Sequence, residues 1–88
     1  MTDEDWKKFR TIFQKVHVGF FTKLKLTYPN LTNGETRLCA LIKLGLNNKE
    51  MASMLGISTM GVVKNKQRLK KKLNLSEDDK LDAIFLDF

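Results

Sequence analysis

The sequence predicts an all-α domain, a bundle of four helices preceded by one long helix rich in aromatic residues. Three observations support this class. Apolar side chains recur every three or four positions, helix-capping residues follow one another at helix-like intervals, and the 88 residues include only five glycines and one proline. A chain of this length fits one small domain, and its 42% hydrophobic and 30% charged content is that of an ordinary globular protein.

The N-terminal segment, residues 1–29, predicts one long amphipathic helix that starts near Asp3 and ends before Pro29. Thr2 and Asp5 have the spacing of a capping box, and a proline disfavours the helical conformation in the residue before it. Large apolar side chains follow at spacings of three and four, which places them on one stripe; they are Trp6, Phe9, Phe13, Val16 and Phe20. The stripe predicts either packing within the domain or the face of a homodimer.

Residues 30–75 predict three helices, and the first of them has both ends marked. Thr32 and Glu35 form the T-x-x-E pattern that starts a helix, and Gly45 suits its left-handed C-terminal cap. Apolar residues recur between these marks at helical spacing. The segment therefore contains one complete helix before the two that follow.

A short helix, a tight turn and a longer basic helix come next. Asn47 marks the start of the short helix and Gly56 its end, and Ser58 can cap a helix that extends over residues 58–73. This order is that of a helix-turn-helix, whose second helix enters the DNA major groove. Small helical bundles without a nucleic-acid partner show the same order of caps and turns.

The C-terminal segment, residues 76–88, is acidic and predicts a fourth helix or a tail. A helix from Ser76 would place Asp78 and Asp79 near its positive N-terminal end. Its apolar residues would share one face; they are Leu81, Ile84 and Phe85.

Charge is distributed unevenly along the chain, whose net charge is +6. Residues 30–75 carry nine basic and two acidic side chains, whereas residues 76–88 carry one basic and five acidic side chains. A positive excess confined to one segment indicates an anionic partner, most often nucleic acid or an anionic membrane. A generic solubilising surface is the alternative interpretation.

The basic third helix of residues 30–75 has a predicted inner side and a predicted outer side. Val62, Leu69 and Leu73 fall within a narrow arc, which must face the core. The remaining surface carries groups suited to base edges; they are Thr59, Met60, Val63, Lys64 and Gln67. It also carries cations suited to the DNA backbone, and together with the preceding helix these are Lys49, Lys66, Arg68, Lys70, Lys71 and Lys72.

Catalysis, metal binding and cofactor binding are not indicated. The sequence has no Gly-rich phosphate loop and no metal-spaced Cys/His cluster. His17 is expected to pack beside the aromatic stripe, and Cys39 is expected to be a small buried side chain. We expect a protein that is not an enzyme and uses no metal or small-molecule cofactor. With no apolar run of ~20 residues and no signal peptide, we also expect a cytoplasmic location.

The order of residues over 31–75 matches a known pattern. The segment reads LTNGETRLCALIKLGLNNKEMASMLGISTMGVVKNKQRLKKKLNL. Its matching features are Leu31, Thr32, Glu35, Leu41, Ile42, Gly45, Leu46, Asn48, Lys49, Glu50, Ala52, Leu55, Ile57, Ser58, Val62, Lys72 and Leu73. The segment closely resembles the LuxR/GerE-type helix-turn-helix at the C-terminus of NarL-like bacterial transcription regulators. This resemblance implies a four-helix domain, sequence-specific binding of double-stranded DNA, and dimerisation on two half-sites.

Three positions depart from the pattern of that family. Gly61 stands where the family usually has Thr, Val63 where it usually has Lys, and Asn65 where it often has His. A glycine inside a helix costs up to ~1 kcal/mol relative to Ala, so we expect DNA or another helix to approach the backbone closely at Gly61. The departures leave the expected fold intact and concern the base contacts that the resemblance implies.

Two functions are predicted, and they differ in class. Residues 1–29 lie outside the usual domain, and with the core they resemble the C-terminal output portion of larger bacterial regulators, whose sensor domain would lie upstream. The first function is therefore that of a DNA-binding module. The second is a protein-interaction module that docks through the aromatic N-terminal helix or through the basic helix, where Met60 and Val63 are expected to be exposed. A membrane-surface role is a third interpretation.

Overall fold

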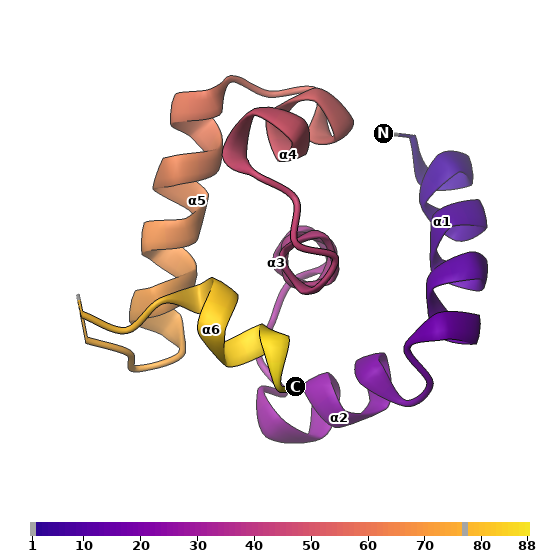
Figure 1. The fold of residues 1–88 in the computed structure, drawn as a ribbon, viewed down its shortest axis with the longest axis horizontal. Coiled ribbons are helices and arrows are strands. Elements are labelled where there is room, and N and C mark those ends of the chain that lie inside the picture. Colours follow the sequence, from indigo (N-terminus) through magenta and orange to yellow (C-terminus); the bar gives the residue numbers. More distant parts are fainter. Residues whose placement is uncertain (1, 77) are drawn as a thin grey trace. The chain divides into compact units, whose positions relative to one another are not determined.

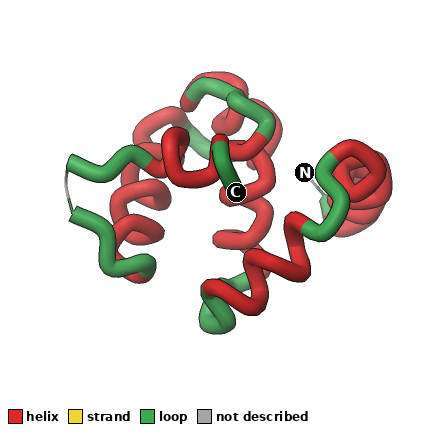
Figure 2. Tube along the Cα trace, turned by 60° about the horizontal axis from the view of Figure 1, so that its bottom comes forward, coloured by secondary structure: helices red, strands yellow, loops and turns green. Residues whose placement is uncertain are grey.

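The computed structural model describes residues 2–76 and 78–88, and over these residues it consists of six α-helices and no strand (Figure 1 and Figure 2). The contacts between residues divide the chain into two compact units, Met1–Asn30 and Leu31–Phe88. The prediction of an all-α protein is confirmed.

The first unit contains α1 (Asp3–Val16) and α2 (Phe20–Thr27). α1 begins with the predicted capping box, in which the N–H of Asp5 donates to Oγ1 of Thr2 at 3.1 Å. α2 ends before Pro29, as the restriction that proline places on the preceding residue requires.

The prediction of a single long helix in this unit is wrong. The helix ends after Val16, and Gly19, which precedes α2, has a left-handed φ of 79° that favours glycine. The break brings the rings of Trp6 and Phe21 to a centroid distance of 6.0 Å, whereas a continuous helix would hold these positions about 22 Å apart. Packing of aromatic side chains across the break is therefore incompatible with one straight helix.

Aromatic rings form the core of the first unit, and we call them the aromatic cluster; its members are Trp6, Phe9, Phe13, Phe20 and Phe21. Phe13 lies at its centre, with ring centroids 5.2 Å from Phe20 and 5.3 Å from Phe21. The ring of His17 packs 4.7 Å from Phe13, as predicted. The guanidinium of Arg10 covers the face of Phe21 at 4.8 Å, a cation–π contact.

The predicted stripe does not behave as one surface. Trp6, Phe13 and Phe20 are buried and Phe9 is half-buried, whereas Val16 is 72% exposed. Val16 is the last residue of α1, and the chain turns away immediately after it. The aromatic members of the stripe therefore pack within the unit, whereas Val16 does not, and the alternative of a dimer face stays a prediction.

The second unit contains the remaining four helices, which are α3 (Asn33–Lys43), α4 (Asn48–Leu55), α5 (Thr59–Lys72) and α6 (Leu81–Leu86). Figure 1 shows α3 end-on, with α4, α5 and α6 arranged around it. Residues 38–42 of α3 are all buried. A helix that is apolar on several sides is typical of a central position, and α3 contacts both α5 and α6.

The helix ends predicted for residues 31–73 are confirmed. Thr32 and Asn47 each form a capping box, and Ser58 caps α5 through its hydroxyl. Gly45 and Gly56 follow α3 and α4 with left-handed φ values of 81° and 71°. Local chemistry thus marks the starts of all three helices with a polar side chain and the ends of α3 and α4 with a glycine.

The last helix begins later than predicted, at Leu81 instead of Ser76. The N–H and hydroxyl of Ser76 both donate to Oδ2 of Asp79, at 2.9 and 3.1 Å, and the N–H of Asp79 donates back to the Ser76 carbonyl. These bonds form a turn ahead of the helix, because Ser and Asp side chains readily bond to nearby backbone. Leu81 and Phe85 of α6 are buried, as expected for its apolar face.

Candidate nucleic-acid interface

α4 and α5 are joined by a turn of three residues, Gly56, Ile57 and Ser58. α4 starts where Oδ1 of Asn47 accepts a hydrogen bond from the N–H of Glu50 at 2.8 Å, and it stops at Gly56. α5 starts where Oγ of Ser58 accepts a hydrogen bond from the N–H of Gly61 at 3.0 Å. The two helices also make the most extensive contact between elements of the second unit. The turn and this contact fix the position of α5 on α4.

Apolar side chains anchor one side of α5 inside the second unit. Val62 and Leu69 have an exposed fraction of 0%, and Leu73, at the end of the helix, is also buried. These are the three residues predicted to face the core. The opposite side of α5 is consequently directed away from the bundle.

The residues predicted to contact bases lie on this outer side. Thr59, Met60, Lys64 and Gln67 are exposed, Met60 to the extent of 62%, and Val63 is half-buried. Met60, Lys64, Gln67 and Lys71 recur at spacings of three and four, so they form one line along the helix. We call these four residues the outer face of α5.

The close neighbours of Gly61 in α5 lie in the turn before the helix, and the expected approach of DNA stays a prediction. A Cβ atom at Gly61 would meet Oγ of Ser58 at 3.3 Å and Cδ1 of Ile57 at 3.5 Å. The close approach therefore comes from the turn that precedes the helix, and within the described chain it does not come from another helix. Gly61 leaves room for the N-cap of α5 and for the side chain of Ile57.

The cations predicted to contact the DNA backbone fall into two groups. Lys49, Arg68 and Lys71 are exposed, whereas Lys66 and Lys70 are half-buried. Nζ of Lys66 lies 3.8 Å from Oδ1 of Asp82 in α6, and its side chain is only 18% exposed. The sequence predicted the same role for all of these cations. The structure shows that they differ in exposure and in ion pairing.

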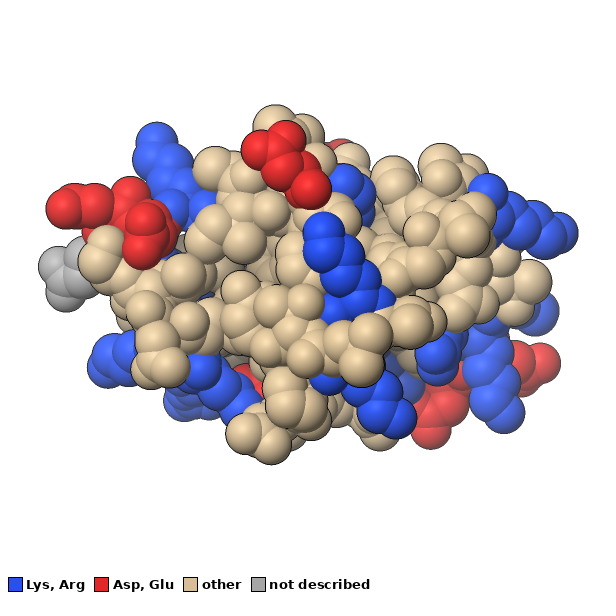
Figure 3. All heavy atoms as spheres, turned by 90° about the horizontal axis from the view of Figure 1, so that it is seen from below, with Lys and Arg blue, Asp and Glu red and all other residues tan. Residues whose placement is uncertain are grey.

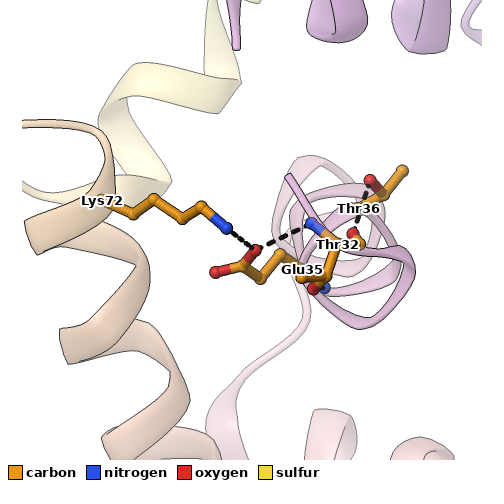
Figure 4. Close-up of polar contacts among 4 residues, drawn as sticks. All are labelled: Thr32, Glu35, Thr36 and Lys72. Carbon is orange, nitrogen blue, oxygen red and sulfur yellow. Dashed lines mark hydrogen bonds and ion pairs between the residues drawn. The ribbon is translucent and has the colours of Figure 1, made fainter. Parts of the chain in front are cut away.

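Lys72 is another predicted cation that pairs within the second unit. Its Nζ donates to Oε1 of Glu35 at 2.7 Å (Figure 4). Glu35 also accepts the N–H of Thr32 in the capping box at 2.8 Å. One carboxylate therefore caps α3 and ties the end of α5 to the start of α3.

The surroundings of Glu35 favour its charged form. Burial disfavours the carboxylate, but the hydrogen bonds from Lys72 and Thr32 and the charge of Lys72 outweigh it, so the pKa of Glu35 is lowered. The predicted role of Glu35 as a capping residue is confirmed, whereas its pairing with Lys72 was missed. The two residues are far apart in the sequence, and no local pattern indicates their contact.

An acidic side chain of α6, Asp82, approaches one flank of α5. Asp82 pairs with Lys66, so part of the positive charge of α5 is compensated within the second unit. On the face drawn in Figure 3, lysine and arginine side chains project from several places, while acidic side chains gather at fewer places. The outer face of α5 keeps Lys64 and Lys71 exposed.

A cavity of about 380 Å³ lies along the other flank of α5. Asn65 and Arg68 line it from α5, Ile57 lines it from the turn, and Glu35 lines it from α3. Arg68 thus lies at the border between this cavity and the outer face of α5. Its guanidinium is exposed on the same helix that carries Lys64 and Lys71.

The described residues contain no group of His, Cys, Asp and Glu side chains that could hold a metal ion. None of the described helices combines the length and the apolar content that crossing a bilayer requires. The chain matches no protein-family model, no curated protein and no solved structure.

Proposed function

We propose that this chain is the sequence-specific DNA-binding module of a bacterial transcriptional regulator. In this proposal α4 and α5 act as a helix-turn-helix, α5 enters the major groove, and α3 to α6 adopt the four-helix arrangement of the LuxR/GerE family. The observation that carries it is the division of α5 into a buried side, with Val62 and Leu69, and an outer face with Lys64 and Gln67.

The dimensions of α5 suit a major groove. Its 14 residues extend over about 21 Å, and the groove is about 12 Å wide, which admits one helix with its side chains. A helix held by one apolar side presents the other side without having to leave the bundle. The outer face can therefore approach bases while the core stays intact.

The groups on the outer face match the chemistry of base edges. Gln67 can donate and accept at once, which suits adenine, and Lys64 suits the acceptors of guanine. The methyl groups of Met60 and Thr59 suit the methyl of thymine. Phosphates would be contacted by Lys71 and by other exposed cations of α4 and α5; these are Lys49 and Arg68.

The proposal extends to the setting of the protein. It implies a cytoplasmic regulator whose sensor domain lies elsewhere in the same regulator, with no cofactor and no enzymatic activity in this module. The resemblance of residues 31–75 to the LuxR/GerE family supports these points. The operator sequence is the first property to measure.

Selection of bound sequences from a random duplex pool tests the proposal directly. We expect an enriched motif, and we expect the logarithm of the affinity for that motif to fall linearly with the logarithm of salt concentration, because neutralised phosphates release counterions. Failure to retain any duplex at low salt would contradict the proposal.

Substitutions on the outer face separate base contacts from phosphate contacts. Gln67→Ala should cost about 1–3 kcal/mol at one position of the motif and relax the preference there. Lys71→Ala should weaken all sequences about equally and reduce the salt slope by about one unit. Equal loss of preference in both variants would contradict these assigned roles.

Lys72→Ala is the matched control for Lys71→Ala, because the two changes remove the same charge from adjacent positions. Lys72 is bonded to Glu35, so its loss should lower the melting temperature of the domain and change the salt slope less. A larger DNA defect for Lys72→Ala would mean that this lysine leaves Glu35 to contact phosphate.

A protein-interaction module is the second candidate, because Met60 is a large apolar side chain that is 62% exposed. Docking of an apolar helix face into a partner groove depends on buried area and changes little with salt. DNA binding by Lys64 and Lys71 would instead fall steeply with salt. The salt dependence of binding therefore distinguishes the two functions.

A further inference from the structure

A line of largely exposed residues runs along α1 beside the buried rings of the aromatic cluster. Ile12 is 65% exposed and Val16 is 72% exposed. Their spacing of four places them on one face, and the half-buried Phe9 and the exposed Asp5 continue that line towards the N-terminus. We call these four residues the Ile12 stripe. Apolar residues exposed together on one helix face, with charged residues at the border, indicate an interaction site.

Charge changes sign along α1. The first turn is acidic, with Asp3, Glu4 and Asp5, and the last turn contains Lys15. In a parallel pair of identical helices, like charges would lie opposite each other. In an antiparallel pair, the acidic start of each helix meets the basic end of the other, and the helix dipoles also align favourably. The charges of α1 therefore complement a second, antiparallel copy of α1.

We propose that the Ile12 stripe is the contact surface between two copies of this chain, joined by antiparallel α1 helices about a two-fold axis. In this pairing Ile12 of each copy packs beside Phe9 of the other, and Asp5 of each copy lies beside Lys15 of the other. Two-fold symmetry places the same patch on both sides, so every contact occurs twice.

The size of the stripe sets the strength of this contact. Two such faces, each from a 14-residue helix, bury less accessible surface in total than the ~1,200–2,000 Å² that stable interfaces bury. The dimer is consequently weak and its population depends on concentration. This inference does not depend on the proposed function, although a dimer would carry two copies of α5 to two half-sites.

Sedimentation equilibrium of the complete 88-residue chain, without DNA, tests the inference. The average mass should rise with concentration from 10.2 kDa towards twice that value. Ile12→Glu should raise the dimer dissociation constant at least tenfold, because symmetry buries the new charge at two places. Val16→Glu, a second exposed position of the stripe, should act in the same direction.

Gln14→Glu is the matched control, since it adds the same charge on the opposite, exposed side of α1. It should leave the dissociation constant unchanged, and circular dichroism should show equal helix content in all these variants. A chain that stays monomeric at all concentrations would overturn the inference. So would an Ile12→Glu variant that dimerises as well as the Gln14→Glu variant.

The orientation of the pair is tested with a spin label on a Glu4→Cys variant. The native thiol of Cys39 is buried, and this burial raises its pKa to about 12, so it does not react with the label. Antiparallel α1 helices should hold the two labels about 20 Å apart along the helix axis. Labels lying side by side, as in a parallel pair, would overturn the proposed arrangement.

Discussion

The two units of the chain differ in how many of their helices start at a side-chain cap. In the second unit, α3, α4 and α5 each start at a side-chain cap, formed by Thr32, Asn47 and Ser58. In the first unit, α1 starts at the Thr2 cap, whereas α2 starts after Gly19, which has no side chain and forms no such hydrogen bond. The sequence predicted the side-chain caps of both units and did not predict the break at Gly19.

In the second unit, α6 likewise has a start that the sequence did not predict correctly. It starts after Lys80 without a side-chain cap, and its predicted start at Ser76 was wrong. A cap formed by a side chain can be recognised in the sequence, because the chemistry is local. A helix start without a side-chain cap has no such local mark, and its position depends on what the flanking segments pack against.

The largest expected effect on stability comes from a substitution in the aromatic cluster of the first unit. Phe13→Ala should destabilise the first unit by about 3–5 kcal/mol, because it leaves a cavity in contact with the rings around it. Trp6, the single tryptophan of the chain, lies in this cluster, so its fluorescence during urea unfolding reports the change. Val16→Ala, at an exposed position of the same helix, should cost less than about 0.5 kcal/mol. Similar values for both variants would show that the cluster does not hold α1 and α2 together.

A pair of glycine substitutions should differ in sign. Gly19→Ala should destabilise the first unit by about 1–2 kcal/mol, since its φ of 79° is unfavourable for any residue with a Cβ. Gly34→Ala should stabilise the second unit by up to about 1 kcal/mol, because Gly34 is helical and its nearest atom would be 4.0 Å away. Melting temperatures from calorimetry measure both. If Gly19→Ala were neutral, the break in the first unit would not depend on glycine.

Removal of one side-chain cap should cost less than the loss of a core ring. Thr32→Ala should lower the stability of the second unit by about 1 kcal/mol, because the N–H of Glu35 loses its acceptor. Thr32→Ser keeps the hydroxyl and should retain most of this stability. Urea unfolding followed by circular dichroism gives both values. An equal loss in the two variants would assign the effect to the methyl group of Thr32.

The smallest expected effect is a pH dependence of the second unit. The pKa of Glu35 is lowered from its ordinary value of 4.5, so its contribution to stability is present above that value. The contribution is lost as the pH falls through the lower pKa of the folded state. Comparing urea midpoints of the natural chain and Glu35→Gln across this range isolates the effect. The natural chain should lose more stability on acidification than the variant does, and parallel curves would contradict the role of Glu35.

α5 shows which features of the candidate site could be predicted from the local sequence pattern. The buried positions of α5 and its outer face with Lys64 and Gln67 follow from helical periodicity alone. The pairing of Lys66 with Asp82 and of Lys72 with Glu35 does not, because each pair joins helices that are distant in the sequence. Periodicity gives the direction of a side chain from its own helix, but it does not identify the residue that it meets.

By itself, the sequence determined the all-α class, the starts of α3, α4 and α5, and the side of α5 that faces the core. These properties depend on hydrogen bonds and apolar spacing among residues that lie within a few positions of one another, so they can be predicted from the sequence. Only the tertiary structure decided that the first unit is two helices, that Ile12 and Val16 are exposed, and which cations are already paired. These properties depend on contacts between segments far apart along the chain, where aromatic packing and ion pairs select among several conformations that local preferences allow.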